Sequence, residues 1–254
     1  MNSMVYLYNG SFISLLTVIN YLLKNNITPY LIKEQDNYEE NLLDKTFYMN
    51  ANDELANELV GKIIKCMPYT SLHHIYYSYL SGEDNKELAI YYYIKNGFKY
   101  SYHINELRNL KCVNKVLSMS KYVGSEAHKL KGFVRFREID KGFLYAEVAP
   151  NNNCISILAS HFVLRLKCEN FVIKDVNRNI ICIHENNSDS YKLYDGREYK
   201  ITNLTISVQE NMYQELWKHF FKTIAIKERE NKKCQMNFMP KRYWKYILEM
   251  NDYE

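Results

Sequence analysis

Proline, glycine and closely spaced cysteines are scarce in this chain of 254 residues, which contains 4 Pro, 8 Gly and 6 Cys. No two cysteines form a C-x-x-C pair, so the ligand spacing of zinc ribbons and iron–sulfur clusters is absent. Isolated cysteines in a chain of this length are typical of reduced, mostly buried thiols. We therefore expect a cytoplasmic protein and predict no metal site.

The chain also lacks the short motifs of common enzyme classes. It contains no G-x-G-x-x-G, no Walker A loop, no G-x-S-x-G elbow and no H-E-x-x-H. Its start, MNSMVYLYNG, has neither the basic nor the apolar region of a signal peptide. The apolar stretch from Phe12 to Leu23 is too short and too polar to span a bilayer. We predict no cofactor and no membrane partner.

Charge is unevenly distributed, although the net charge is only +4. Residues 1–60 carry a net charge of −5, whereas residues 115–137 and residues 211–250 each carry +5. Such polarity fits a protein that offers one face to a polyanion. A chance dipole on a nearly neutral protein gives the same pattern.

The N-terminal half combines a small α/β pattern over residues 1–50 with several helical patterns. Met4–Tyr8 alternates as a strand does, and Ser11 is placed to cap a helix. Short strands are predicted at Tyr30–Ile32 and Thr46–Met49. Helical spacing then covers residues 53–66, 71–80, 84–95 and 104–121, and the second and third of these helices are predicted to end at Gly82 and Gly97.

The middle of the chain changes to strand patterns. Alternation predicts one hairpin from Gly132–Arg137 and Phe143–Val148, and a second from Phe171–Val176 and Ile180–His184. An amphipathic helix, Ile155–Leu166, lies between them. Gly142 and Asn179 occupy turn positions at which we predict φ > 0. Residues 191–193 and 199–207 are further candidate strands.

The C-terminal region is predicted to be helical. Over Asn211–Ile226, an apolar face that includes Trp217 is expected to be buried in the core. Pro240 suits the first turn of a terminal helix, Lys241–Glu249. The prediction is an α+β fold with a helical N-terminal half, central antiparallel hairpins with an intervening helix, and a helical C-terminus. We divide it into residues 1–131, 132–208 and 209–254, or treat it as one compact domain.

Aromatic residues and cations alternate near the C-terminus, as suits phosphates and bases. Arg135 and Arg137 are predicted on one strand face, and Arg165 lies four residues after His161 on one helix. A bound phosphate would offset the unfavourable placement of Lys241 and Arg242 at the start of the terminal helix. Alternatively, these cations lie on solvent-exposed faces and bind no ligand. The predicted nucleic-acid-binding residues are Arg135, Arg165, Lys218, Lys222, Arg229, Lys241, Arg242, Tyr243 and Trp244.

Glu126, His128 and His161 are the candidates for acid–base catalysis. If Glu126 and His128 share a helix, their side chains point about 160° apart and cannot act on one substrate. A pairing of Glu126 with Lys129 is the simpler interpretation. We therefore predict that Glu126 and His128 do not form a catalytic dyad.

Several longer segments resemble a bacterial family of DNA-metabolism or DNA-repair proteins. The resemblance rests on Tyr8–Phe12, Glu126–Lys129, Gly132–Phe136, Leu158–Phe162, Trp217–Asn231 and Met239–Trp244. In that family, the gene accompanies a radical SAM protein, and the domain is sometimes joined to a uracil-DNA glycosylase-like domain. The resemblance implies DNA, a radical SAM protein and a glycosylase-like protein as partners. Position 9, where the family usually has Asp, is Asn9 here.

Three functions fit these observations. We favour a DNA-binding accessory protein that uses a basic C-terminal face and works with a radical SAM or glycosylase-type partner. A DNA-lesion-processing enzyme that uses Glu126, His128 or His161 is the alternative, and a protein-interaction scaffold is the third. An enzyme should gather its acid–base residues in one concave site, whereas a binding protein should show a broad basic face.

Overall fold

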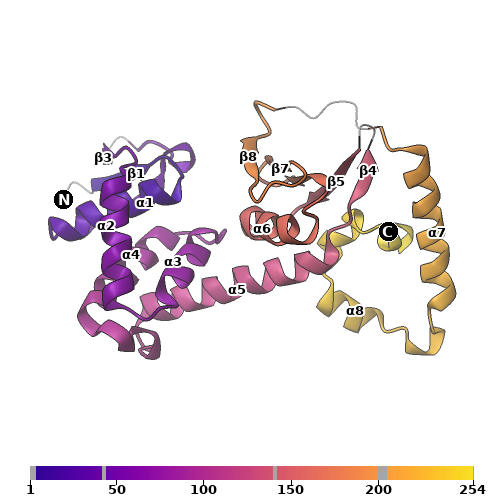
Figure 1. Cartoon of the computed structure of the whole chain (residues 1–254). Coiled ribbons are helices and arrows are strands. Elements are labelled where there is room, and N and C mark those ends of the chain that lie inside the picture. The colour runs from indigo at the N-terminus through magenta and orange to yellow at the C-terminus, as the bar shows by residue number, and fades with distance from the viewer. Residues whose placement is uncertain (1–3, 42–43, 140–141, 200–204, 254) are drawn as a thin grey trace. The chain divides into compact units, whose positions relative to one another are not determined.

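The computed structural model describes residues 4–41, 44–139, 142–199 and 205–253. The chain forms two compact units, which we call the N-terminal unit (Met1–Gly124) and the C-terminal unit (Ser125–Glu254). The boundary falls within one helix, α5 (Lys111–Phe133). The mixed α+β class predicted from the sequence is confirmed (Figure 1).

The N-terminal unit contains a parallel sheet of three short strands. The central strand β1 (Met4–Tyr8) pairs with β2 (Leu31–Glu34) on one side and with β3 (Lys45–Tyr48) on the other. Helix α1 (Phe12–Lys24) connects β1 to β2, and the Ser11 hydroxyl caps it by accepting a hydrogen bond from the Ser14 amide at 3.1 Å. The predicted strand and cap are therefore confirmed.

Helices complete the core of this unit. The unit continues with a 3-10 turn, η1 (Gln35–Asn37), and with α2 (Asp53–Cys66), α3 (Ser71–Tyr79), α4 (Lys86–Tyr100) and a 3-10 helix, η2 (Ser101–Glu106). Their apolar faces pack with α1 and the first part of α5 around fully buried residues such as Leu15, Ile19, Leu59 and Ile94. Helix α2 has the predicted bounds because Asn52 caps its start and Pro68 follows its end.

Two boundaries in this region were predicted wrongly. Gly97 does not end a helix, since α4 continues to Tyr100; a Cβ atom at position 97 would lie 2.2 Å from the Met67 Cε. This glycine permits close packing of the helix. The helix predicted at 104–121 begins only at Lys111 and extends to Phe133, because buried apolar residues continue at helical spacing through Val123 and Leu130.

The C-terminal unit is built on a sheet in the order β4-β5-β6-β7-β8. The strands are β4 (Arg137–Ile139), β5 (Phe143–Val148), β6 (Asn170–Asp175), β7 (Ile180–His184) and β8 (Lys192–Asp195). The neighbours β4 and β5, β6 and β7, and β7 and β8 are antiparallel, whereas β5 and β6 are parallel. Helix α6 (Ile155–Arg165) connects the two hairpins and packs on β6 and β7 (Figure 1).

The two turn residues have the predicted backbone conformation, with φ values of 70° at Gly142 and 53° at Asn179. Asp140 and Lys141, which precede Gly142 in the predicted first turn, lie outside the described residues, as do residues 200–204 of the candidate strand at 199–207. Ile206, just after them, forms a bridge with Ile139.

The first hairpin is shorter than predicted. Gly132 and Phe133 are helical, and the Val134 amide donates to the Leu130 carbonyl at 3.0 Å, so the helical bonding pattern continues into the predicted strand. Strand β4 starts only at Arg137. Arg135 therefore does not share a strand face with Arg137, and this part of the prediction is wrong.

The C-terminal segment consists of one long helix and several short ones. These are α7 (Val208–Ile224), η3 (Lys227–Arg229), α8 (Lys232–Phe238), η4 (Lys241–Tyr246) and η5 (Leu248–Tyr253). The predicted α-helix at Lys241–Glu249 is thus replaced by two 3-10 segments. Among the described residues, no helix has the length and apolar character needed to cross a membrane.

Candidate nucleic-acid interface

A groove of about 900 Å³ lies within the C-terminal unit, among α7, β4, β5 and the η4–η5 segment. Its aromatic lining comes from Phe136, Tyr213, Trp217, Phe220 and Tyr246. Its charged lining comes from Arg135, Arg137, Lys245, Glu147 and Glu210. The groove therefore combines flat rings with cations, as sites for nucleic acids do.

The apolar face of α7 forms one wall of this groove and is open to solvent. Leu216 is 61% exposed, Trp217 is 42% exposed and Phe220 is 52% exposed. We predicted that Trp217 belongs to the core, and this is wrong. The helical spacing predicts the apolar face of α7 correctly. This face lines a groove instead of a core, and the spacing of apolar residues does not distinguish the two.

Polar contacts at the start and in the middle of α7 hold this helix beside the groove. The Glu138 amide of β4 donates to the Glu210 carboxylate at 3.1 Å, and the Ser207 hydroxyl caps the helix at the Glu210 amide. Further along, the Trp217 indole donates to Glu249 at 3.1 Å. The position of the aromatic wall is therefore set by hydrogen bonds as well as by packing.

Acidic residues hold the groove arginines in place. Arg135 binds the nearly buried Glu249 carboxylate at 2.6 Å, and Arg137 binds Glu147 at 3.3 Å while lying over the Tyr145 ring. Burial alone would raise the pKa of Glu249, but the hydrogen bonds from Arg135 and other donors outweigh burial and lower it. Glu249 is therefore ionised at neutral pH, and it joins Arg135 to Trp217.

Tyr243 and Trp244 lie in the interior, contrary to their predicted role as base-stacking residues. Tyr243 packs against Phe133, and the Trp244 indole donates to the Met239 carbonyl at 2.9 Å. Trp244 is only 6% exposed, and the Lys241 ammonium lies 5.8 Å from its ring centroid. The two tryptophans thus exchange the roles that we predicted: Trp244 is buried and Trp217 is accessible.

Arg242 has a structural partner. Its guanidinium binds the buried Glu126 carboxylate at 3.1 Å and the Tyr243 hydroxyl at 2.8 Å. Because η4 is a short 3-10 segment, the helix N-terminus that motivated a phosphate site at Lys241 and Arg242 is not formed. Lys241 stays exposed, whereas Arg242 is half-exposed and committed to Glu126.

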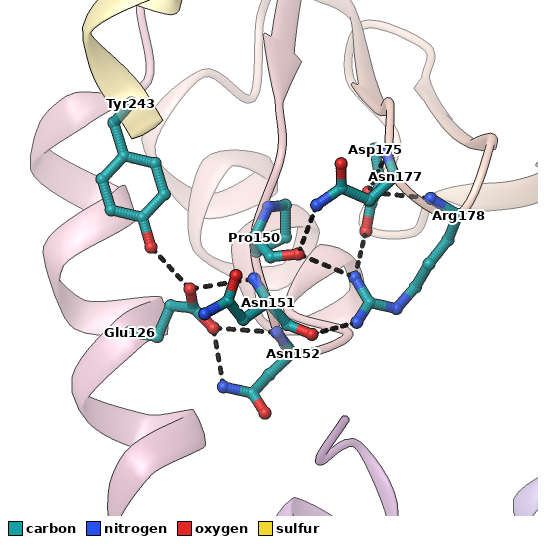
Figure 2. A network of polar contacts seen from close by, with 8 residues as sticks. All are labelled: Glu126, Pro150, Asn151, Asn152, Asp175, Asn177, Arg178 and Tyr243. Atoms are coloured by element: carbon teal, nitrogen blue, oxygen red, sulfur yellow. Dashed lines mark hydrogen bonds and ion pairs between the residues drawn. The ribbon is translucent and has the colours of Figure 1, made fainter. Parts of the chain in front are cut away.

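Glu126 organises a network between α5, η4 and the loop before α6 (Figure 2). Its carboxylate accepts hydrogen bonds from the Asn151 and Asn152 amides at 3.0 and 2.9 Å, from the Asn152 side chain at 2.7 Å and from the Tyr243 hydroxyl at 2.5 Å. Burial raises the pKa of Glu126, but the hydrogen bonds from Tyr243, Asn151 and Asn152 outweigh burial and lower it. An acid held ionised by this many donors is a structural anchor.

A second buried carboxylate, Asp175, holds the other side of the same loop (Figure 2). It accepts from the Asn177 and Arg178 amides and forms an ion pair with the Arg178 guanidinium at 3.2 Å. Arg178 also donates to the carbonyl oxygens of Pro150 and Asn151. Burial raises the pKa of Asp175 despite these donors. The loop is therefore bonded from both sides.

Glu126 and His128, two of the acid–base candidates, do not share one site. Glu126 is 6% exposed, whereas His128 is exposed on the same helix, so their side chains diverge as the spacing predicts. Glu126 bonds Arg242 and Tyr243 instead of the predicted Lys129. Among the described residues, no three His, Cys, Asp or Glu side chains are grouped as they would be around a metal ion.

His161 has a cationic environment on α6. Burial and the nearby charges of Lys131 and Arg165 lower the pKa of His161. Arg165 is exposed in the last turn of the helix, where a cation also interacts favourably with the helix dipole. The predicted closeness of His161 and Arg165 is confirmed, and their role in binding stays a prediction.

The remaining predicted binding residues lie outside the groove lining. Lys218 and Lys222 are on α7, and Lys218 forms an ion pair with Glu215 at 3.2 Å. At the spacing of one continuous helix, Arg229 is predicted on the same face as Lys218 and Lys222, but α7 ends at Ile224 and Arg229 belongs to η3. Tyr213, Phe220 and Tyr246 were not among the predicted site residues, although the repeat of Tyr213, Trp217 and Phe220 is visible in the sequence.

Net charge belongs entirely to the unit that contains the groove. Residues 125–254 hold 21 Lys/Arg and 17 Asp/Glu, whereas residues 1–124 hold 12 of each. The C-terminal unit is therefore basic and the N-terminal unit is neutral. This partition is what a polyanion-binding unit joined to a neutral unit would show.

A family model described as a domain of unknown function, DUF4130, matches residues 84–249. This match covers well over half of the chain, so the chain belongs to the DUF4130 family. It includes the described elements that form the groove, from β4 to η4. No curated protein matches the chain.

Proposed function

We propose that this protein is a DNA-binding accessory protein that works with a radical SAM protein or a uracil-DNA glycosylase-like protein. The observation that carries the proposal is the groove of the basic C-terminal unit, which unites aromatic and cationic side chains in one concavity. Cations neutralise phosphates and release counterions, and this effect supplies much of the affinity of proteins for DNA.

The choice of partner rests on the family resemblance of the sequence. Proteins that act on one base need a DNA strand held in position, and an accessory unit with a ring-lined groove supplies such a hold. The partner proposal has its own test. A radical SAM protein or a glycosylase-like protein from the same genome should be retained by the immobilised full chain, and adding DNA should strengthen the retention.

The DNA-binding proposal is tested by fluorescence anisotropy with plain, nicked and uracil-containing DNA at two salt concentrations. Neutralising Lys218 and Lys222 to Gln should weaken binding about equally for all sequences and should lower the salt slope by roughly one unit for each phosphate that is no longer neutralised. Lys45→Gln with Lys65→Gln is the matched control, because these lysines are exposed on the neutral N-terminal unit.

Two results would contradict the proposal. The first is no binding of any DNA by the folded full chain at low salt. The second is equal weakening by the control pair and by the α7 pair, which would show that charge acts without regard to its position. Either outcome favours the function of a protein-interaction scaffold.

A further inference from the structure

The aromatic wall of α7 carries a more specific inference, which rests on the proposed function. We propose that the groove binds a DNA single strand whose unpaired bases stack on the rings of α7. Tyr213, Trp217 and Phe220 lie at helical spacing on the groove side. These residues are 42% to 66% exposed, so their rings are accessible to a ligand.

The rings are close enough to one another to act together. The ring centroids of Trp217 and Phe220 are 5.9 Å apart, and their planes are tilted by 35°. Phe136 and Tyr246 add further aromatic lining from other segments of the C-terminal unit. Every base has a π-face, so a wall of this kind binds bases with little dependence on sequence.

The charge pattern favours a single strand over a duplex. The two groove arginines are matched by Glu249 and Glu147, so the centre of the groove carries little net charge. Lys218 lies one helical turn from the groove-lining Gln214, about 40° away on the α7 surface. A single strand turns its bases inward and its phosphates outward, which matches a ring-lined centre with a cation at its border. A duplex keeps the faces of its bases stacked inside and exposes only phosphates, sugars and base edges, so no base face is free to stack on the rings of α7.

The size of the groove agrees with this ligand. Its volume of about 900 Å³ is near the upper end of the range of roughly 300–1,000 Å³ for ligand sites. Such a volume accommodates more than one base. The interaction is therefore with a short stretch of strand, and base stacking on several rings supplies the affinity.

The two tryptophans make the inference measurable in the unlabelled protein. The chain contains 2 Trp, of which Trp217 faces the groove and Trp244 is buried. A base stacked on Trp217 should quench its emission and leave that of Trp244 unchanged. The quenched fraction should therefore disappear in Trp217→Phe, which keeps an aromatic ring in the same place.

The test compares three ligands on the full chain at low salt: an oligothymidine, a duplex of equal length and an abasic oligomer with the same number of phosphates. We expect the oligothymidine to bind more tightly than the duplex and at least about fivefold more tightly than the abasic oligomer, a factor that corresponds to about 1 kcal/mol of stacking. Phe220→Ala, which removes one of these rings, should reduce this preference measurably. Phe238→Ala is the matched control, since Phe238 is exposed on α8 outside the groove lining.

The outcomes separate this inference from the proposed function. Equal affinity for the oligothymidine and the abasic oligomer, or equal effects of Phe220→Ala and Phe238→Ala, would overturn base stacking in the groove and leave DNA binding intact. Failure of all three ligands to bind would overturn both. Circular dichroism of each variant should match that of the parent protein, because both phenylalanines are exposed.

Discussion

Helices α1 and α7 have similar amphipathic patterns, but the two units use them differently. In the N-terminal unit, the apolar face of α1 is buried, with Leu15 and Ile19 fully inaccessible. In the C-terminal unit, α7 has no buried residue among those described, and its apolar face lines an open groove. An amphipathic repeat therefore predicts that a face is apolar, and it does not predict what covers that face.

The two units also differ in net charge and in how they bury carboxylates. The N-terminal unit is neutral and buries Glu87 beside the Tyr8 hydroxyl at 3.0 Å. The C-terminal unit is basic and buries two carboxylates, Glu126 and Asp175, in networks that hold one loop from both sides. The first unit resembles an ordinary packed core, whereas the second combines buried polar anchors for one loop with an open groove elsewhere in the unit. We therefore expect function to reside in the second.

The largest expected difference concerns leucine truncation. Leu15→Ala removes a fully buried side chain and should destabilise the N-terminal unit by about 2–5 kcal/mol. Leu216→Ala, on the exposed face of α7, should change stability by less than about 0.5 kcal/mol. Thermal unfolding of both variants measures the contrast. Comparable destabilisation would show that α7 is covered in solution.

The next effect is the removal of the Glu126 anchor. Glu126→Gln keeps the shape of the side chain but places an amide among donors, so it should cost about 2–4 kcal/mol. Urea unfolding followed by tryptophan fluorescence reports on this unit, which contains both Trp217 and Trp244. The control His128→Gln, on the exposed face of the same helix, should be nearly silent. A silent Glu126→Gln would refute the anchoring role.

The two buried carboxylates should respond to acid with opposite signs. The folded pKa of Glu126 is lowered, so its stabilisation is complete above its ordinary pKa of about 4.3 and is lost as pH falls through the folded value. The pKa of Asp175 is raised, so between its ordinary and folded values acidification favours the folded state. On acidification, the stability advantage of wild type over Glu126→Gln should therefore decrease. The stability of wild type relative to Asp175→Asn should instead increase. Parallel trends would contradict this assignment.

The smallest expected change in stability comes from removing either of two tyrosine hydroxyls near the groove. The Tyr145 hydroxyl donates to Glu147 at 2.8 Å, so Tyr145→Phe should cost about 1 kcal/mol. The Tyr246 hydroxyl is buried and has no hydrogen-bond partner among the described residues, so Tyr246→Phe should be neutral or slightly stabilising. Thermal unfolding of both variants, compared with wild type, measures the two changes in stability. A clear decrease of stability in Tyr246→Phe would reveal a bound water or another partner.

Local patterns predicted much of the fold correctly. The Ser11 cap, the bounds of α2, the second hairpin and the positive φ values at Gly142 and Asn179 all depend on neighbouring residues, and the sequence contains that information directly. Two boundaries were predicted wrongly at positions that also make distant contacts. Gly97 lies against Met67 inside α4, and α5 extends to Phe133, whose ring packs on Tyr243.

By itself, the sequence determined the α+β class, the position of most helices and strands, the concentration of positive charge after residue 124 and the mixture of aromatic and cationic side chains at the C-terminus. Only the tertiary structure decided that Trp217 is accessible and Trp244 is buried, that Arg242 binds Glu126, and that α7 lines a groove. The physical reason is that helical spacing and charge are properties of short segments. Burial depends on which distant segment packs against them.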